Sequence, residues 1–360
     1  TLKIANQAKP AVCVVDNPPY CPERRPSPMP KTTPTLAEIA TAAGVSTMTA
    51  SRAVNHQPGV SRSTRDAILK LAHNMGYVAN RSAQKLSGGR SRVIGLLAAD
   101  LGNAFTSALV SGAVQAVAAA GNEVLIYSLV DRAQRPNDNV LQLLQQFTDG
   151  VIAILPYQFG FVESLSAAQV PVVTIDQHTE HAEFPSIAAD SYGGARSAML
   201  HLAGLGHRRI GLIAGRLNVS TSRERRLGYD DAMAAHKLPV APEYIRGGDF
   251  KQASGLAMAE ELLALPAPPT ALFVLNNLMT VGALEAIHRR KLKIPKDIAV
   301  IGFDDLPWAE ALDPPLTVVR QPAYEVGQAA AELLLKRLED PKRAETHLKL
   351  LPKLVLRSSC

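Results

Sequence analysis

A segment near the N-terminus combines the side chains with which a helix reads the edges of DNA bases. Ser46, Thr47, Thr49 and Ser51 are short, so a helix that carries them can lie deep in the major groove of a duplex. Arg52 can then donate two parallel hydrogen bonds to O6 and N7 of a guanine. The pattern predicts a DNA-reading helix, and the alternative is a three-helix bundle that binds a protein.

Positive charge is concentrated around this segment. Residues 31–92 contain nine Lys and Arg against two acidic residues, Glu38 and Asp66, which leaves a net charge of +7, whereas the whole chain carries +6. A basic domain joined to a nearly neutral body is the electrostatic footprint expected of nucleic-acid binding. Charge alone is a weak signal, because short basic helices are often plain solvated surface.

The elements that must position these residues begin at Thr35. With Glu38 three positions later, Thr35 predicts a capping box at the start of a helix that Gly44 ends. Ser46 can cap a second helix over residues 47–54. Two short helices joined by a tight turn that contains glycine form a candidate helix-turn-helix motif.

Two further helices and a tail flank this motif. The run 63–66 can cap a third helix, which Gly76 ends, and Asn80 can cap a fourth helix over residues 81–86. Residues 1–34 carry eight prolines and little hydrophobic periodicity. We therefore expect a disordered tail before the first helix.

After Arg92 the sequence alternates between strand-like and helix-like stretches. This rhythm, with near-continuous apolar strands, predicts parallel sheets that are covered by helices on both faces. The stretch is long for one sheet, so we expect two doubly wound lobes with a cleft between them. The predicted strands are 93–98, 124–129, 151–155, 172–175, 210–214, 271–275 and 299–303, and the predicted helices include 108–120, 194–205, 254–265 and 279–291.

Composition argues against membrane and secreted proteins. The apolar runs are too short for a membrane helix, and the N-terminus has no apolar segment of the kind that a secretory signal carries. Cys13, Cys21 and Cys360 all lie in the tails, a distribution that favours the reducing cytosol. We therefore expect a cytoplasmic protein.

Enzyme motifs are missing from the positions where they would be expected. The first predicted strand is followed by Asp100-Leu101-Gly102-Asn103 instead of a dinucleotide-binding loop, and the chain has neither a nucleophile elbow nor a Walker loop. His178 and His181 are three residues apart, but no cysteine lies near them and the segment has no helical pattern. We expect no catalytic residues, no cofactor and no metal.

Runs of residues at fixed spacing extend from Thr35 to nearly the C-terminus. Near the N-terminus they are 35–40, 43–55, Val60-Ser61, Thr64-Arg65, Gly76-Tyr77 and 80–86, and in the body they are Arg225-x-x-Gly228-Tyr229 and Gly302-Phe303-Asp304-Asp305. With these runs the sequence closely resembles the lactose/galactose repressor family of bacterial transcription regulators. The resemblance covers about 320 residues.

The resemblance implies roles for the residues of the predicted helix-turn-helix. Thr47, Met48 and Arg52 match base-reading positions of the family. Another set matches positions near phosphates, which orient the domain without specifying sequence. This set is Thr35, Ser46, Ser51, Asn55 and Thr64.

In the family, the short helix that follows lies in the minor groove, and its leucine wedges between central base pairs and kinks the duplex. The resemblance therefore implies DNA contacts for Asn80, Ala83 and Leu86. The alternative is a linker turn that packs on the body. Ala79 stands where the family usually has proline, so we expect a less rigid hinge.

The body resembles the family's effector domain, which is itself similar to periplasmic sugar-binding proteins. Carboxylate, guanidinium and amide groups at strand ends suit vicinal hydroxyls, and open α/β sheets bind ligands at those ends. For each position alone, an ordinary strand-end polar residue is the alternative. The resemblance implies polar effector contacts by Asp190, Arg225, Asn276, Asp304 and Gln321, and apolar or stacking contacts by Phe105 and Trp308. Asn277 stands where the family usually has aspartate, a change that we expect to affect ligand choice.

These observations divide the chain into four parts. They are a tail (1–34), a small all-α helix-turn-helix head (35–79), a hinge helix and linker (80–91), and an effector-binding and dimerisation domain of two periplasmic-binding-protein-like lobes (92–358). We expect a homodimeric repressor that binds a near-palindromic double-stranded operator, responds to a small sugar or sugar-like effector, and has no membrane partner. The rival hypothesis is a soluble sugar-binding protein or sugar-processing enzyme with an incidental basic N-terminus.

Overall fold

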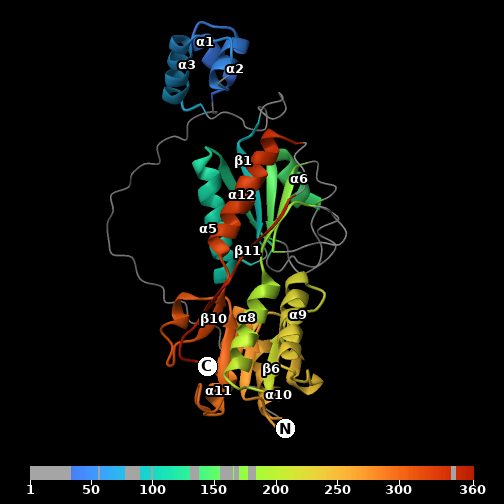
Figure 1. The fold of residues 1–360 in the computed structure, drawn as a ribbon. Coiled ribbons are helices and arrows are strands. Elements are labelled where there is room, and N and C mark those ends of the chain that lie inside the picture. The colour runs from blue at the N-terminus through green and yellow to red at the C-terminus, as the bar shows by residue number, and fades with distance from the viewer. Residues whose placement is uncertain are drawn as a thin grey trace, which may run out of the picture. The chain divides into compact units, whose positions relative to one another are not determined.

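The computed structural model describes residues 34–55, 57–77, 90–98, 100–129, 138–154, 165, 170–176, 184–341 and 346–360 (Figure 1). The chain separates into two compact units, residues 1–80 and residues 81–360, and each is described by itself. The predicted tail up to residue 33 and the predicted hinge helix lie outside the described residues.

In the first unit, called the head below, the described residues form three helices: α1 (Leu36–Ala42), α2 (Thr47–Val54) and α3 (Arg62–Asn74). Thr35 and Glu38 form the predicted capping box, and Ser46 caps α2 by accepting a hydrogen bond from the Thr49 N–H at 3.1 Å. The cap of α3 differs from the prediction. Ser61 accepts from the Thr64 N–H, so the helix begins at Arg62 rather than after the run 63–66.

A small core holds the head together. Ile39, Ala53, Ile68 and Ala72 are buried against one another, one or two from each helix. Gly44 and Gly76 follow α1 and α3 with φ of +66° and +71°, in the left-handed region where glycine has no Cβ to strain. The side chains on the outer side of α2 are therefore free to contact a partner.

The second unit contains two lobes, each with a six-stranded sheet. The sheet of the first lobe is wholly parallel, in the order β11-β5-β4-β3-β1-β2. Its strands are β1 (Val93–Ala98), β2 (Glu123–Ser128), β3 (Gly150–Ile154), β4 (Val172–Ile175), β5 (Ser186–Ala189) and β11 (His347–Leu350), and its helices are α5 (Ala104–Ala119), α6 (Asp138–Phe147) and α12 (Ala323–Glu339).

Two glycines bring α5 and α12 into close contact. A Cβ on Gly112 would lie 1.9 Å from the main-chain oxygen of Tyr324, and a Cβ on Gly327 would lie 1.9 Å from that of Leu109. Figure 1 shows the two helices side by side. The lobe is thus closed by a helix that comes from the C-terminal part of the chain.

The second lobe has the order β12-β10-β9-β8-β6-β7, parallel except for the edge pair β10–β12. Its strands are β6 (Ile210–Ala214), β7 (Ile245–Gly247), β8 (Ala271–Val274), β9 (Ala299–Phe303), β10 (Thr317–Arg320) and β12 (Lys353–Val355). Its helices are α8 (Ser191–Gly204), α9 (Ser220–Ala235), α10 (Gln252–Leu263) and α11 (Asn277–Arg289), with short 3₁₀ turns at Pro242–Tyr244 and at Pro307–Ala309.

The chain passes between the lobes three times. It crosses after β5 into α8, after β10 into α12, and after β11 into β12. Asp190 and Gln321 lie at the first two of these crossings. The topology therefore places polar residues that are far apart in sequence at the same junction.

Candidate functional sites

The outer side of α2 presents the side chains that were predicted to read bases. Thr47, Met48 and Arg52 are all exposed, and Met48 is 65% exposed although it is apolar. The guanidinium of Arg52 passes Gly59, whose φ is +95° and where a Cβ would lie 3.3 Å from Arg52 Nη1. A solvated guanidinium and an uncovered apolar side chain on one short helix are suited to a groove of DNA.

The residues predicted to lie near phosphates gather at helix ends. Thr35 and Ser46 are the N-caps of α1 and α2, and Thr64 lies in the first turn of α3, where its hydroxyl is 2.7 Å from that of Ser61. Helix N-termini attract phosphate through free N–H groups and the helix dipole. Asn55 donates to Ser51 at 3.2 Å at the C-terminal end of α2. Asn80, Ala83 and Leu86 lie outside the described residues.

The second site is the inter-lobe cluster, defined here as Asn103, Asp176, Ser191, Arg225, Asn277, Asp304 and Gln321. Its centre is Arg225 on α9, which is 5% exposed. Arg225 Nε donates to Ser191 Oγ at 3.2 Å, Nη1 donates to the Leu275 carbonyl at 2.7 Å, and the guanidinium carbon lies 3.8 Å from the centre of the Phe303 ring. Arg225 is therefore not solvated, because backbone and aromatic groups enclose it.

Asp304 follows β9 and is held from several sides. Gln321 Nε2 donates to Asp304 Oδ1 at 2.5 Å, and the main-chain N–H of Asn277 donates to the same carboxylate. Burial raises the pKa of Asp304, while Arg225, Gln321 and Asn277 act in the opposite direction. Two of the predicted effector residues, Asp304 and Gln321, are thus in direct contact, and both lie near Arg225.

Asp176 follows β4 in the first lobe and was missed by the sequence analysis. Its Oδ1 is buried without a hydrogen-bond partner, although the residue as a whole is half-buried. Burial raises the pKa of Asp176 to about 7, with Asp304 and Glu224 adding to the effect and Arg225 opposing it. Its place directly after the predicted strand 172–175 was the available signal, since Asp304 follows its own strand in the same way.

Asn103 and Asn277 join the two lobes through their amides. Asn277 Nδ2 donates to Asn103 Oδ1 at 2.8 Å, and Asn103 Nδ2 donates to Asn277 Oδ1 at 3.3 Å. Each residue also serves a helix, because Asn103 caps α5 and Asn277 accepts from the Leu278 N–H at the start of α11. A second bridge is the ion pair of Lys349 on β11 with Glu224 on α9, at 2.7 Å.

The remaining predicted effector residues have other contacts. Asp190 is the half-buried N-cap of α8, and Asn276 is the buried N-cap of α11. Each side chain accepts a hydrogen bond from a main-chain N–H at 2.9 Å. Phe105 packs against the core of the first lobe, and Trp308 is 36% exposed in the turn Pro307–Ala309. The structure thus brings Arg225, Asp304 and Gln321 together, with Asp190 and Asn276 one residue from members of the cluster.

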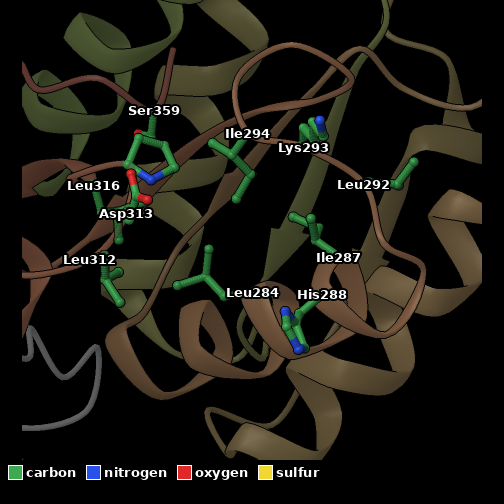
Figure 2. Close-up of a pocket in the computed structure, with 11 residues that line it drawn as sticks. Leu284, Ile287, His288, Leu292, Lys293, Ile294, Leu312, Asp313, Leu316 and Ser359 are labelled. Atoms are coloured by element: carbon green, nitrogen blue, oxygen red, sulfur yellow. The ribbon is translucent and has the colours of Figure 1, made fainter.

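A separate pocket of about 440 Å³ lies in the second lobe. Figure 2 shows its lining, which combines α11 (Leu284, Ile287 and His288) with the segments 292–294 and 312–316 and with Ser359. None of the seven predicted effector residues lines it.

In the described ranges, no helix is long and apolar enough to cross a membrane, and no group of three His, Cys, Asp or Glu is arranged to hold a metal ion. His178 and His181 fall outside these ranges.

An exposed helix-turn-helix head joined to a two-lobed α/β body defines a class of DNA-binding regulators. Two family models match the chain: "Bacterial regulatory proteins, lacI family" over residues 35–80 and "Periplasmic binding protein-like domain" over residues 199–360. The HTH-type transcriptional repressor CytR of Escherichia coli (strain K12) is 32% identical over 312 residues, which is 86% of this chain and 91% of the relative.

Solved structures agree with this result. A lac repressor dimer bound to operator and the anti-inducer ONPF is 30% identical with a TM-score of 0.78, over 91% of this chain and 99% of that chain. The complex of the transcriptional regulator CelR with cellobiose is 29% identical with a TM-score of 0.70, over 91% and 100%. The chain belongs to the LacI family of bacterial transcription regulators. The predicted family and fold class are confirmed, as is the prediction of a regulator rather than an enzyme.

Proposed function

We propose that the protein is a cytoplasmic repressor that binds a near-palindromic operator as a homodimer, and that a small sugar-like effector at the inter-lobe cluster changes its affinity for that operator. The observation that carries the effector site is the set of buried polar groups at the junction of the lobes, two of which have unpartnered atoms. A ligand bound there contacts both lobes and so favours one relative arrangement of them. Ligand and operator then change each other's affinity by the same factor.

The proposed division of DNA contacts rests on the exposure of α2. Thr47, Met48 and Arg52 read bases, whereas the residues at helix N-termini contact phosphates. In the undescribed segment, Asn80, Ala83 and Leu86 are proposed to contact the minor groove, as the resemblance implies. Two heads on one dimer match two half-sites of an operator.

Arg52→Ala tests the reading of bases. The operator is first obtained by selecting random duplexes with the purified full chain. The substitution should then cost about 1–3 kcal/mol of binding free energy on the selected operator and little on random DNA, because a bidentate contact to guanine is lost. Fluorescence anisotropy titrations at one fixed salt concentration measure both values.

Lys70→Ala is the matched control, since it removes the same charge from the exposed surface of α3. It should weaken binding to both duplexes by a similar, smaller amount. Equal losses on both duplexes for Arg52→Ala would show that Arg52 contacts only phosphate. No salt-dependent binding to any duplex would favour the rival hypothesis of a sugar-binding protein or enzyme.

Gln321→Met tests the effector site. Methionine keeps the length of the side chain but removes the hydrogen bond of the amide to Asp304 and its unpartnered acceptor oxygen. A thermal-shift screen of sugars and nucleosides on the wild-type chain identifies a ligand, because a ligand at 100 times its Kd adds about 2.7 kcal/mol of stability. The variant should bind the selected operator normally and lose the response to this ligand.

Leu284→Ala, in the pocket of Figure 2, is the control variant. We expect its effector response to match that of the wild type. If Leu284→Ala loses the response and Gln321→Met keeps it, the effector binds in that pocket and the inter-lobe assignment is wrong.

A further inference from the structure

The residues that begin the second unit are held by a set of short hydrogen bonds. Arg90, Ser91 and Arg92 are its first described residues, and they precede β1. The carboxylate of Asp149 accepts from the Ser91 N–H, the Ser91 hydroxyl and the Arg92 N–H, each at 2.8 Å. Bonds to a carboxylate are stronger than bonds between neutral groups, and Ser91 is only 3% exposed to competing water. Arg90, Ser91, Arg92 and Asp149 are called the linker anchor below.

The linker anchor also fixes the backbone where the chain enters β1. Arg92 has a φ of +55°, in the left-handed region that a non-glycine residue keeps only where its surroundings determine it. The Arg92 carbonyl accepts from the Glu123 N–H at the start of β2, and the Asp149 N–H donates to the Val93 carbonyl, both at 2.8 Å. The direction in which the chain enters the sheet is therefore set on both sides of β1.

Arg90 adds a contact with the C-terminal end of α12. Its Nη2 donates to the Leu338 carbonyl, which lies in the last turn and has no acceptor role within the helix. The positive charge is also favourable at this end of the helix dipole. The other end of α12 begins two residues after Gln321, and the close approach of Gly327 to α5 holds the helix in between. One helix thus extends from the inter-lobe cluster to the linker anchor.

Both attachments of the linker anchor are made by the first lobe. Asp149 lies between α6 and β3, and Leu338 belongs to α12, which packs on the sheet of that lobe. The anchor therefore moves with the first lobe as one body. A contact that served only to close the sheet would not need the exposed guanidinium of Arg90 at a helix end.

We propose that the linker anchor sets the spacing of the two half-sites that a dimer binds, with Asp149 and Arg90 as its positioning residues. The inference rests on the proposed binding of an operator by a homodimer, and it adds residues that do not touch DNA themselves. In a dimer, two anchors fix the points and directions from which the two linkers leave. A linker held at its base reaches few positions, whereas a linker released there reaches many, so the anchor restricts the accepted spacing.

Operators of altered spacing test the proposal on the full chain. The duplexes are the selected operator, the same operator with one base pair inserted or removed at its centre, and a duplex with a single half-site. One base pair moves a half-site by about 3.4 Å and turns it by about 34°. Fluorescence anisotropy at one fixed salt concentration gives each Kd. The wild-type chain should prefer the selected spacing by about tenfold or more, because DNA or protein must deform to fit the others.

Asp149→Asn and Arg90→Ala should each lower this spacing preference about fivefold, the effect of one lost hydrogen bond expressed in Kd. The Kd for the single half-site should stay close to that of the wild type, since no DNA contact is removed. Melting temperatures are measured in parallel. Asp149→Asn is expected to be the less stable variant, because its NH₂ group faces one of the N–H groups that the carboxylate accepted. Arg90 is exposed, so Arg90→Ala should melt like the wild type.

Arg92→Ala is the matched control. It removes the same charge two residues away, its side chain is exposed, and its main-chain N–H still donates to Asp149. It should weaken binding to all duplexes alike and keep the spacing preference. An equal loss of preference in Arg92→Ala and Arg90→Ala would show an effect of charge alone and overturn the inference.

Two further outcomes separate the inference from the proposed function. If Asp149→Asn and Arg90→Ala keep the wild-type spacing preference, the linker anchor only stabilises the fold and the inference is wrong, whatever the melting temperatures. If the wild-type chain binds the single half-site as tightly as the selected operator, the proposed binding of an operator by a dimer is itself wrong.

Discussion

The two lobes place a carboxylate at the junction by the same local structure. Asp176 follows β4 with φ of +66°, and Asp304 follows β9 with φ of +76°. The N–H of each residue donates to the neighbouring strand at 2.9 Å, to Ile187 in the first lobe and to Val319 in the second. Non-glycine residues in this left-handed region persist only where the surroundings fix them, so the two positions are constrained alike.

The environments of the two carboxylates differ. Burial raises the pKa of both carboxyl groups, to about 7 for Asp176. Asp304 accepts from Gln321 and Asn277, whereas Asp176 keeps one buried oxygen without a partner. The carboxylate of the second lobe is therefore preassembled and that of the first lobe is incomplete, although Gln321 Oε1 beside Asp304 also lacks a partner. An unpartnered buried acceptor costs free energy that a ligand donor can recover, so the incomplete lobe is the side that a ligand stabilises most.

Arg225→Ala should have the largest effect, because it removes the cation that both carboxylates face. We expect a loss of about 3–5 kcal/mol in the free energy of unfolding, the usual result of breaking a buried charge network. Urea denaturation of the body, followed by circular dichroism, measures it. Operator binding by the head should survive below the melting temperature.

Arg226→Ala is the control for this variant. Arg226 is the next residue on α9, but it forms a partly exposed pair with Asp230 and should contribute about 1 kcal/mol or less. If both variants lose the same small amount of unfolding free energy, the guanidinium of Arg225 does not stabilise the two carboxylates. The described difference between the lobes then has no energetic basis.

Asp176→Asn should stabilise the protein, in contrast to Arg225→Ala. Between about pH 4 and pH 7 the unfolded chain has released the Asp176 proton while the folded chain keeps it, so stability falls as pH rises through this window. The gain from the substitution should therefore be small at pH 4 and constant above pH 7. Its upper bound is about 4 kcal/mol at pH 8, less for a half-buried residue.

Asp304→Asn makes the comparison between the lobes direct. Burial also raises the pKa of Asp304, so removing its charge favours the folded chain at pH 8. The asparagine turns an NH₂ group toward either the Gln321 amide or the Asn277 N–H, however, so we expect a smaller gain in stability than Asp176→Asn gives. Melting temperatures of both variants at pH 5 and pH 8 decide the matter. An equal or larger gain for Asp304→Asn would show that neither carboxylate is preassembled.

Local signals were sufficient for much of the fold. The strands β1, β3, β4, β6, β8 and β9 and the helices α1 and α2 lie within a few residues of the predicted ranges, because apolar runs and caps are properties of neighbouring residues. The predicted helices of the body began two to four residues late, as the comparison of 108–120 with Ala104–Ala119 shows. Asn103 and Asn277, which mark two true starts, lie outside the apolar pattern.

Pairing between distant segments escaped prediction. β5, β10, β11 and β12 are three to four residues long, and each pairs with one strand that lies across a chain crossing, β5 with β11 and β10 with β12. The charged sequence of α9 also hid the helix that carries Arg225, since a helix with few apolar residues gives a weak periodic signal.

The same limit applies to the site. The family resemblance pointed to Arg225, Asp304 and Gln321, but the burial of Arg225 depends on Ser191, Leu275 and Phe303, which come from three other places in the second lobe. The contact of Asn103 with Asn277 spans 174 residues of sequence. No short-range pattern encodes such a distance, whereas the position of Asp176 after a strand could have been used.

The amide pair that joins the lobes gives the smallest predicted effect. With Asn at 277, one side chain both donates to and accepts from Asn103. An aspartate there would still accept from Asn103 Nδ2 and from the Leu278 N–H, and its charge is favourable at the N-terminus of α11. The aspartate would lack the N–H group that donates to Asn103, and it would place a carboxylate oxygen against Asn103 Oδ1.

Asn277→Asp should therefore weaken the junction while leaving the fold nearly unchanged. We expect the melting temperature to stay within a few degrees, and the Kd of the effector to rise about fivefold, since one inter-lobe hydrogen bond is worth about 1 kcal/mol. A double-mutant cycle with Asn103→Ala, measured by isothermal titration, isolates the pair. If the effects of the two substitutions on the binding free energy of the effector are additive, the amides do not couple the lobes. The ligand alone then connects Asp304 in the second lobe with Asp176 in the first.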